Sequence, residues 1–466
     1  MLSICFISKA LMSRNKKFFI KTYGCQMNSY DSDRIAEILL LAGHIKTSLP
    51  EDADIVVINT CNVREKAQEK LFSDLGRIAL IKAKAAEKGR SVIILVVGCV
   101  AQALGKEIFA RADCVDIVLG PQAYQNIQKS IEEVISQKQC PEVKMQKNFI
   151  VDTTMSAEDK FKLLPRNRTL VKLPSAFISI QEGCDKFCTY CSVPYTRGRE
   201  YSRPTSEIIS EANQLVSSGA REIFLLGQNV SAYNGKYSSS AVCSFTELLF
   251  LISSIKGVER IRYTTSHPCD ITTELMKAHK EISSLMPFIH LPAQSGSDII
   301  LKKMNRGYSR SQYIKIINEF RKILPNIAFS SDFIVGFPGE TETDFEATCA
   351  LVDEVSYAQA YSFKYSPRPQ TPSSKWDQID EQTKIRRLAV LQEIINKHQL
   401  HYNQSMEGKE LLVLIEKEGR YENQVIGKTE YMQSVHLSAP KNFIGKVFPV
   451  KISRGFQNSL SGKLVG

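Results

Sequence analysis

The sequence lacks any apolar run long enough to cross a bilayer. The longest one, residues 92–100, is interrupted by Gly98 and Cys99, and a membrane helix needs roughly 20 apolar residues. The first eleven residues, "MLSICFISKAL", contain Lys9 and no small-residue cleavage site, which argues against a signal peptide. We therefore expect a cytoplasmic protein that does not bind a membrane.

Acidic residues are also scarce relative to basic ones. The chain has 60 Lys and Arg against 49 Asp and Glu, a formal net charge of +11. Residues 441–466 contain no acid at all and carry five cations: Lys441, Lys446, Lys451, Arg454 and Lys463. An excess of positive charge suggests an anionic partner, such as nucleic acid. A solvated charged surface would explain the composition equally well.

Disulfides are not expected among the 12 cysteines, because the cytoplasm keeps thiols reduced. Metal binding or catalysis must then explain the cysteines that cluster. The stretch "EGCDKFCTYCSVPYTRG", residues 182–198, contains Cys184, Cys188 and Cys191, and the next cysteine is Cys243. Without a nearby fourth ligand, a metal bound there would keep one position open, which is typical of catalytic sites. All-thiolate ligation suits zinc or an iron–sulfur cluster.

A second set of cysteines ends three strand-like runs near the start of the chain. The runs are "KKFFIKTYGC", "ADIVVINTC" and "SVIILVVGC", which end at Cys25, Cys61 and Cys99. Helical sequence separates them, so the pattern predicts a parallel sheet covered by helices. Ligands of such sheets bind at the carboxyl ends of the strands, where the three thiols would converge. The alternative is three separate buried cysteines that pack as small hydrophobic residues.

The length of 466 residues predicts two or three domains. Residues 16–139 form the first α/β domain, and residues 140–172 are polar, without clear periodicity, and are predicted as a linker. In residues 173–402 six strand-like runs, each but the last followed by helical sequence, predict a partial or complete α/β barrel with its chemistry at the carboxyl strand ends. These runs begin near residues 175, 221, 259, 287, 328 and 358. Short β-branched runs around glycines predict a small antiparallel barrel over residues 403–466.

The CxxxCxxC spacing, with Tyr190 before the last cysteine, resembles the signature of the radical S-adenosylmethionine (SAM) superfamily. Further stretches resemble one branch of it, the radical SAM methylthiotransferase family, over nearly the whole chain. They are "KTYGCQMNSYDSDR", "NTCNVREKA", "GCVAQ", "LLGQNVSAY", "HLPAQSGSD", "MNRGY" and "DFIVGFPGET". The resemblance implies a partial (βα)6 radical SAM barrel and a carboxy-terminal TRAM domain, which is a small RNA-binding β-barrel.

The resemblance also implies the chemistry and the ligands. Cys184, Cys188 and Cys191 would bind a [4Fe–4S] cluster whose open iron chelates SAM, and Cys25, Cys61 and Cys99 would bind a second [4Fe–4S] cluster that supplies or carries sulfur. One SAM would provide the methyl group and another the radical that takes hydrogen from C2 of adenine. The sequences of these motifs are most similar to those of the branch that adds a methylthio group to N6-isopentenyladenosine at position 37, beside the anticodon of tRNA. The implied partners are tRNA, an electron donor such as flavodoxin or ferredoxin and a sulfur source, and we expect a monomer.

Three further residues are candidates for SAM binding. Tyr190 lies within the cysteine motif, and Gln228 lies in "LLGQNV", where many superfamily members instead carry Gly-Gly-Glu to hold the SAM ammonium. Gly336, in "IVGFPGE", would allow close backbone approach to adenosine, although a turn without a ligand would also require a glycine. Arg197 and Arg199 could contact RNA phosphate or the SAM carboxylate, and the sequence does not choose between them.

Several alternatives remain at the level of sequence. Other methylthiotransferases act on threonylcarbamoyladenosine in tRNA or on an aspartate of a ribosomal protein. A non-catalytic electron-transfer iron–sulfur protein would need neither the barrel nor open coordination sites. A zinc-dependent RNA-binding protein would need closed four-ligand sites, and neither cysteine set supplies a fourth ligand.

Overall fold

The computed structural model describes residues 15–61, 65–139, 149–166, 173–238 and 241–465. The chain divides into two compact units, which are described separately. Unit 1 comprises residues 1–170, 182–184 and 192–201, and unit 2 comprises residues 171–181, 185–191 and 202–466. The first eleven residues, and residues 140–148 and 167–172 of the predicted linker, lie outside the described ranges.

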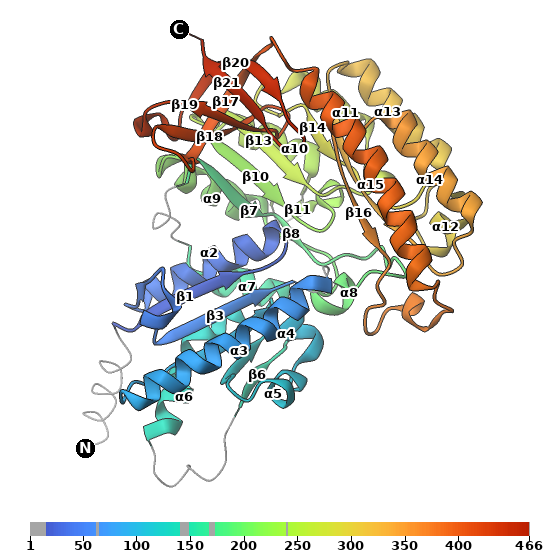
Figure 1. Cartoon of the computed structure of the whole chain (residues 1–466). Coiled ribbons are helices and arrows are strands. Elements are labelled where there is room, and N and C mark those ends of the chain that lie inside the picture. The colour runs from blue at the N-terminus through green and yellow to red at the C-terminus, as the bar shows by residue number, and fades with distance from the viewer. Residues whose placement is uncertain (1–14, 62–64, 140–148, 167–172, 239–240, 466) are drawn as a thin grey trace. The chain divides into compact units, whose positions relative to one another are not determined.

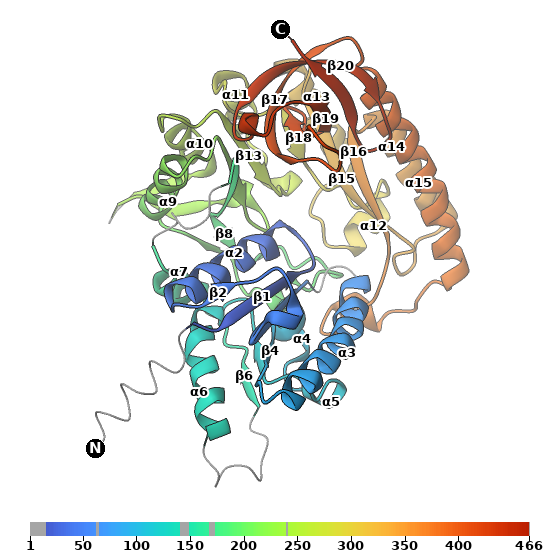
Figure 2. The ribbon, with the colours of Figure 1, turned by 60° about the vertical axis from the view of Figure 1, so that its left-hand side comes forward.

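Unit 1 is built on a six-stranded parallel sheet in the order β2-β1-β3-β4-β5-β6. The strands are β1 (Lys17–Thr22), β2 (Ile45–Lys46), β3 (Ile55–Thr60), β4 (Ile93–Gly98), β5 (Ile117–Leu119) and β6 (Ile150–Asp152). The helices are α2 (Gln26–Leu41), α3 (Glu65–Glu87), α4 (Cys99–Leu104), α5 (Glu107–Arg111), α6 (Ile127–Gln139), α7 (Ala157–Leu163) and α8 (Val193–Thr196). Every residue of β3 and β4 is buried, as helices on both faces require, and Figure 2 shows α2 and α6 on one face and α3 on the other. The prediction of a parallel α/β sheet is confirmed.

The described part of the predicted linker contains regular structure. Its run Ile150–Asp152 forms β6, which pairs in parallel with β5 at the edge of the sheet. Ser156 then caps α7 by accepting a hydrogen bond from the Asp159 amide. A three-residue edge strand is too short to show a period of two, which explains why the sequence did not indicate it.

The six predicted barrel strands of unit 2 are all present, and most of them are labelled in Figure 1. They form two three-stranded parallel sheets, β13-β10-β7 and β14-β15-β16, and a parallel bridge joins Ile261 of β13 to Leu285 just before β14. Their bounds are β7 (Ser175–Ser179), β10 (Glu222–Leu226), β13 (Arg260–Thr264), β14 (Phe288–His290), β15 (Ala328–Val335) and β16 (Gln359–Lys364). Two short ladders, β8 (Gln181–Glu182) with β9 (Tyr201–Ser202) and β11 (Asn234–Lys236) with β12 (Val242–Ser244), lie outside these sheets.

Helices follow all six of these strands, as a βα barrel requires, and the connections after β7 and β10 also contain the two short ladders. They are α9 (Thr205–Ser217), α10 (Phe245–Ser253), α11 (Thr273–Glu281), α12 (Asp298–Lys303), α13 (Arg310–Ile323), α14 (Glu342–Val355) and, after β16, α15 (Glu381–Gln404). Capping boxes begin three of them, at Ser244, Ser309 and Thr341, and each satisfies two backbone donors that would otherwise be left open. Among the helices described, none combines the length and the apolar character that a membrane crossing demands.

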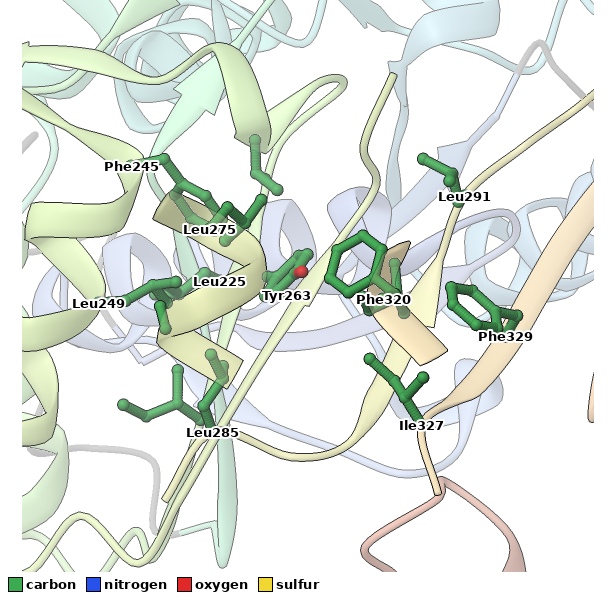
Figure 3. Close-up of a cluster of buried hydrophobic side chains, with 14 of the residues drawn as sticks. Leu225, Phe245, Leu249, Tyr263, Leu275, Leu285, Leu291, Phe320, Ile327 and Phe329 are labelled. Atoms are coloured by element: carbon green, nitrogen blue, oxygen red, sulfur yellow. The ribbon is translucent and has the colours of Figure 1, made fainter. Parts of the chain in front are cut away.

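The core of the unit 2 barrel lies between the strands and these helices (Figure 3). In Figure 3 the Tyr263 ring of β13 lies between Leu225 of β10 and Phe320 of α13. The Tyr263 hydroxyl forms a 2.8 Å hydrogen bond with Nε2 of His279, a buried residue of α11. This histidine is thus a polar group in an apolar core: its Nε2 is paired with one phenol, and its Nδ1 is buried without a hydrogen-bond partner among the described residues.

Acidification is expected to destabilise unit 2 through His279. Burial lowers the pKa of this imidazole to about 3, against about 6.5 in an unfolded chain, so its contribution to stability is complete above pH 6.5 and is lost as the pH falls toward 3. By pH 5.5 the loss amounts to about 1.4 kcal/mol. His279→Gln keeps a hydrogen-bonding group beside Tyr263 but does not titrate, so its free energy of unfolding should fall by about 1.4 kcal/mol less between pH 7.5 and 5.5.

Denaturant unfolding followed by tryptophan fluorescence measures this difference, since the single tryptophan, Trp376, belongs to unit 2. An equal loss of stability in the parent and in His279→Gln would show that the histidine charge does not oppose folding.

The carboxy-terminal segment is a closed five-stranded barrel in the order β17-β18-β19-β21-β20. Its strands are β17 (Glu410–Glu418), β18 (Gln424–Thr429), β19 (Ser434–Ser438), β20 (Val447–Gly455) and β21 (Leu460–Leu464). Two arginines of β13 bind its backbone: Arg260 donates to the carbonyls of Leu412 and Lys428, and Arg262 donates to those of Thr429 and Glu430. Arg260 is the first residue of β13, so the small barrel docks at the amino ends of the parallel strands.

Candidate metal centres

The three amino-terminal cysteines lie at the carboxyl ends of three neighbouring strands, as predicted. β1, β3 and β4 are adjacent in the sheet, and Cys61 and Cys99 each follow their strand directly. Cys25 comes three residues after β1 and immediately precedes α2. Cys61 and Cys99 are buried, whereas Cys25 is exposed. Parallel pairing therefore brings together thiols that are far apart in the sequence.

Two buried asparagines fix the distance between the first two strand ends. Asn28 of α2 donates from Nδ2 to Oδ1 of Asn59, at 3.0 Å, and Asn59 donates in return to the carbonyl oxygen of Asn28, at 2.9 Å. The Cys25 thiol lies 3.3 Å from Oδ1 of Asn28. The same pair thus links the start of α2, directly after Cys25, to the penultimate residue of β3, directly before Thr60 and Cys61.

Glycines allow the strand ends to approach this closely. Gly24 has a φ of +129°, and a Cβ there would lie 2.3 Å from the Cβ of Cys61. Gly98 has a φ of +94°, and a Cβ there would lie 2.4 Å from Oδ1 of Asn59. Only glycine combines these backbone angles with this close contact.

The surroundings favour a thiolate at Cys25. A hydrogen bond from Cys61 is the main cause that lowers the pKa of Cys25 to about 6, and the positive charge of Arg197 acts in the same direction. Burial instead raises the pKa of Cys99, although a hydrogen bond from Arg197 and its charge oppose that effect. Within the described residues no three His, Cys, Asp or Glu side chains are close enough together to hold a metal ion as they stand. Metal coordination would replace the hydrogen bonds that the thiols form here.

Arg197 belongs to a ring of four buried charges in unit 1. It contacts Asp31 at 2.7 Å and Glu182 at 3.3 Å. Lys160 contacts the same two carboxylates at 3.1 and 2.6 Å. None of the four residues is more than 2% exposed. This burial excludes an RNA-phosphate contact for Arg197, one of the two roles that the sequence left open.

The cysteines of the CxxxCxxC loop are divided between the two units, and each group is described by itself. In unit 1, the Cys184 amide donates to the carbonyl of Gly198 at 3.2 Å. In unit 2, the Cys191 amide donates to the carbonyl of Cys188 at 3.0 Å. Arg306, a buried residue, donates from Nη1 to the Cys188 sulfur at 3.4 Å. Arg306 lies in the stretch "MNRGY", but its sequence position alone does not indicate a contact with a cysteine.

Tyr190 packs beside this loop in unit 2. Its ring meets Phe337 edge-on, at a centroid distance of 6.5 Å, and joins a small apolar cluster with Met304 and Tyr365. Burial raises the pKa of Tyr190 well above its ordinary value. The phenol therefore stays neutral and supports the loop through packing.

The other two SAM candidates lie at carboxyl ends of strands in unit 2. The Gln228 amide, after β10, donates to Oε1 of Gln181 at 2.9 Å. Gly336, after β15, has a φ of +68°, and its amide donates to Glu340 at 2.6 Å. A Cβ at Gly336 would lie 2.5 Å from Cγ of Lys384. The turn and the lysine thus require glycine at this position without any ligand, and its role toward adenosine stays a prediction.

A polar chain that the sequence analysis missed lies next to Gln228. Asn229 donates from Nδ2 to Asp270 at 2.7 Å and accepts from the amide of His267 at 2.9 Å. Lys186, of the cysteine loop, contacts the other oxygen of Asp270 at 2.8 Å. Asp270 comes after β13 in a sequence without a recognisable motif, so only the fold brings it to this strand end.

Family descriptions match three consecutive parts of the chain. Residues 17–120 match the Uncharacterized protein family UPF0004, residues 178–352 match the Radical SAM superfamily, and residues 404–465 match the TRAM domain. The first match covers β1 to β5 of the unit 1 sheet, the second covers the six-stranded barrel as far as α14, and the third covers the closed small barrel.

Curated relatives resemble the chain over its full length. A tRNA-2-methylthio-N(6)-dimethylallyladenosine synthase of Rickettsia rickettsii (strain Sheila Smith) is 49% identical over 97% of this chain and 100% of the relative. The protein of the same name from Rickettsia felis (strain ATCC VR-1525 / URRWXCal2) is 48% identical with the same coverage. The chain belongs to the tRNA-2-methylthio-N(6)-dimethylallyladenosine synthase family. The family resemblance inferred from the motifs is confirmed.

Solved structures support the fold of this family member. The radical S-adenosylmethionine methyltransferase TsrM from Kitasatospora setae aligns with a TM-score of 0.55 at 12% identity, over 77% of this chain and 75% of its own. The cobalamin-dependent S-adenosylmethionine radical enzyme OxsB aligns with a TM-score of 0.53 at 12% identity, over 83% of this chain and 57% of its own. At such low identity these alignments speak only for the fold, and they agree with the predicted radical SAM barrel.

Proposed function

We propose that this chain is an enzyme that adds a methylthio group to C2 of N6-isopentenyladenosine at position 37 of tRNA, beside the anticodon. The observation that carries the proposal is the placement of two cysteine triads at carboxyl ends of parallel strands, in a chain that matches the synthase relatives from end to end. A non-catalytic electron-transfer protein would need neither the barrel nor the open coordination sites.

The residues present fit two [4Fe–4S] clusters. Cys25, Cys61 and Cys99 would hold one, because they offer three soft donors at adjacent strand ends next to a buried cation. Cys184, Cys188 and Cys191 would hold the other, and three thiolates leave one iron free for SAM. When bound, the clusters and SAM would supply the radical, the sulfur and the methyl group of the reaction.

The chain's own residues orient these groups. Arg306 directs an N–H at the Cys188 sulfur, and such contacts to a coordinating sulfur fix its position and tune the metal. Gln181 receives the backbone amides of Gln228 and Asn229 on one oxygen, at 2.9 and 3.1 Å, and thereby shapes the turn after β10. We propose that this turn, with Tyr190 and Gly336, lines the SAM site. The Asp270 carboxylate, already paired with Lys186, is a further candidate for contact with the SAM ammonium.

The partners follow from the same proposal. The TRAM barrel would supply affinity for tRNA through its exposed cations. Flipping the target base into the barrel is least costly in an anticodon loop, where the base is already unpaired. An electron donor such as flavodoxin or ferredoxin, a sulfur source, a monomeric state and a cytoplasmic location stay predictions.

The substrate is tested with reconstituted protein, SAM, a reductant and three tRNAs that are unmodified, isopentenylated or threonylcarbamoylated at position 37. We expect methylthiolation only of the isopentenylated tRNA, because apolar contacts to the N6 group should discriminate by about 1–3 kcal/mol per methylene-scale difference. Mass spectrometry of the nucleosides measures the product.

Methylthiolation only of the threonylcarbamoylated tRNA would contradict the proposed substrate. Modification of a ribosomal protein with no turnover of any tRNA would contradict the RNA substrate altogether.

A further inference from the structure

The buried charges of unit 1 form a closed ring in which each cation contacts both carboxylates. The four contacts are Arg197–Asp31 at 2.7 Å, Lys160–Asp31 at 3.1 Å, Lys160–Glu182 at 2.6 Å and Arg197–Glu182 at 3.3 Å. Gln122 adds a hydrogen bond from Nε2 to the Arg197 carbonyl oxygen at 2.7 Å. Two positive and two negative charges make the ring neutral as a whole.

The ring joins four segments that are distant in the sequence. Asp31 lies on α2, Lys160 on α7, Glu182 on β8, and Arg197 directly follows α8. Glu182 precedes Cys184 by two residues, and Asp31 follows Cys25 by six. The ring therefore lies between the segment that carries the amino-terminal thiols and the segments that begin and end the CxxxCxxC loop.

Stability alone does not explain such a ring. Removing four charges from water costs several kcal/mol per ion. A protein with such a buried ion network is often no more stable than one with apolar side chains of the same volume in its place. The guanidinium, however, has donors beyond those that its carboxylates use. The short helix α8, which ends directly before Arg197, packs against α4, which begins at Cys99, and a hydrogen bond from Arg197 is among the causes that act on the pKa of the Cys99 thiol. The charge of Arg197 also acts on Cys25. The ring thus holds one oriented N–H donor against the thiol site.

We infer that Arg197 is a positioning residue for the amino-terminal cluster: its N–H bonds to a coordinating sulfur and raises the reduction potential of that cluster, while Asp31 and Glu182 hold the guanidinium in place. Hydrogen bonds to the sulfurs and the local net charge are two of the factors that set such potentials. Reduction adds a negative charge, so a nearby donor and cation stabilise the reduced state. The inference rests on the proposed cluster ligation by Cys25, Cys61 and Cys99.

Removing a cation of the ring and removing an anion of the ring should shift the reduction potential in opposite directions. Arg197→Met removes the donor and leaves two carboxylates against one lysine, so the potential should shift to a more negative value. Asp31→Asn removes a negative charge of similar position, so the potential should shift to a more positive value. Arg197→Lys keeps the charge and a donor, so its potential should stay close to that of the parent. A role confined to packing would give no such pattern of signs.

The potential is measured by titration of the reconstituted full chain with dithionite, followed by electron paramagnetic resonance, with iron content and circular dichroism as checks on loading and folding. The same variants in a Cys184→Ala, Cys188→Ala, Cys191→Ala background isolate the signal of the amino-terminal cluster. Arg262 and Glu222 provide the matched control, because they form an equally buried pair, also at 2.7 Å, in unit 2. Arg262→Met and Glu222→Gln should leave the potential unchanged.

Two failures can be told apart. If the triple-cysteine background binds no cluster, the ligation proposed for Cys25, Cys61 and Cys99 is wrong. If that cluster is present but Asp31→Asn leaves its potential unchanged or shifts it to a more negative value, the role inferred for Arg197 is wrong. If Arg197→Met alone loses the cluster, the other two variants still test the inference: Arg197→Lys must keep the potential close to that of the parent, and Asp31→Asn must shift it to a more positive value.

Discussion

Replacing Cys184, Cys188 and Cys191 together by alanine is expected to lower the iron content from about eight to about four atoms per chain and to abolish reductive cleavage of SAM. The remaining iron should be bound by Cys25, Cys61 and Cys99, which belong entirely to unit 1. Arg306 keeps bonds to Tyr308 and to the carbonyl of Pro292 after the Cys188 sulfur is removed, so its charge is not left without partners. Iron and sulfide analysis and the yield of 5′-deoxyadenosine measure the two outcomes.

A matched control removes three other thiols. Cys114, Cys243 and Cys349 belong to neither triad, and their simultaneous change to alanine should preserve about eight iron atoms and SAM cleavage. The reciprocal change of Cys25, Cys61 and Cys99 should leave one cluster and SAM cleavage but stop methylthiolation. Loss of all iron in the CxxxCxxC variant would contradict two independent sites.

The sequence predicted those parts of the fold that depend on strong local patterns. Apolar runs of five to eight residues, followed by helical periodicity, located β3, β4 and the six barrel strands, and parallel pairing then placed Cys25, Cys61 and Cys99 at one edge. The thiol placement needed only the order of elements. The same local rules failed at β6, where three half-buried residues form an edge strand inside a predicted linker.

The charge ring could not be predicted from the sequence. Lys160 and Glu182 are among the residue types that are least often fully buried, and each lies in a stretch without a motif. Their partners come from α2 and from the residue after α8, so only the tertiary fold reveals the four contacts. The motif made Arg197 a candidate for contact with RNA phosphate or with the SAM carboxylate. Only its burial in the fold excludes the RNA phosphate.

The docking of the small barrel also depends on tertiary contacts. Arg262 is held by Glu222 at 2.7 Å while it donates to carbonyls of β18 and the turn that follows it. Glu222 and Arg260 are the first residues of their strands, and Arg262 lies two residues further along β13, whereas Cys188 and Cys191 follow the carboxyl end of β7. Within unit 2 the small barrel and this part of the cysteine loop are therefore at opposite ends of the sheet, and RNA affinity should be separable from SAM chemistry.

Changing the five exposed cations of residues 441–466 to glutamine is expected to weaken tRNA binding strongly without affecting SAM cleavage in the absence of RNA. They are Lys441, Lys446, Lys451, Arg454 and Lys463, and no acid lies among them. If each cation neutralises one phosphate, a plot of the logarithm of the binding constant against the logarithm of the salt concentration should be less steep for the variant, by roughly 3.5–4.5. Between 50 and 200 mM salt the parent should therefore lose roughly 130 to 500 times more affinity than the variant. Filter binding or fluorescence anisotropy across that range measures the slope.

A variant with the same change in net charge separates local contacts from the overall field of the protein. Five exposed lysines elsewhere in unit 2 serve for it: Lys256, Lys277, Lys280, Lys315 and Lys322. Their change to glutamine should reduce the association rate slightly through the long-range field, yet preserve most of the salt slope. If both variants lose affinity and salt slope equally, the small barrel contributes only to the net charge. If the barrel variant binds tRNA as tightly as the parent at the same salt, the RNA-binding surface lies elsewhere on the chain.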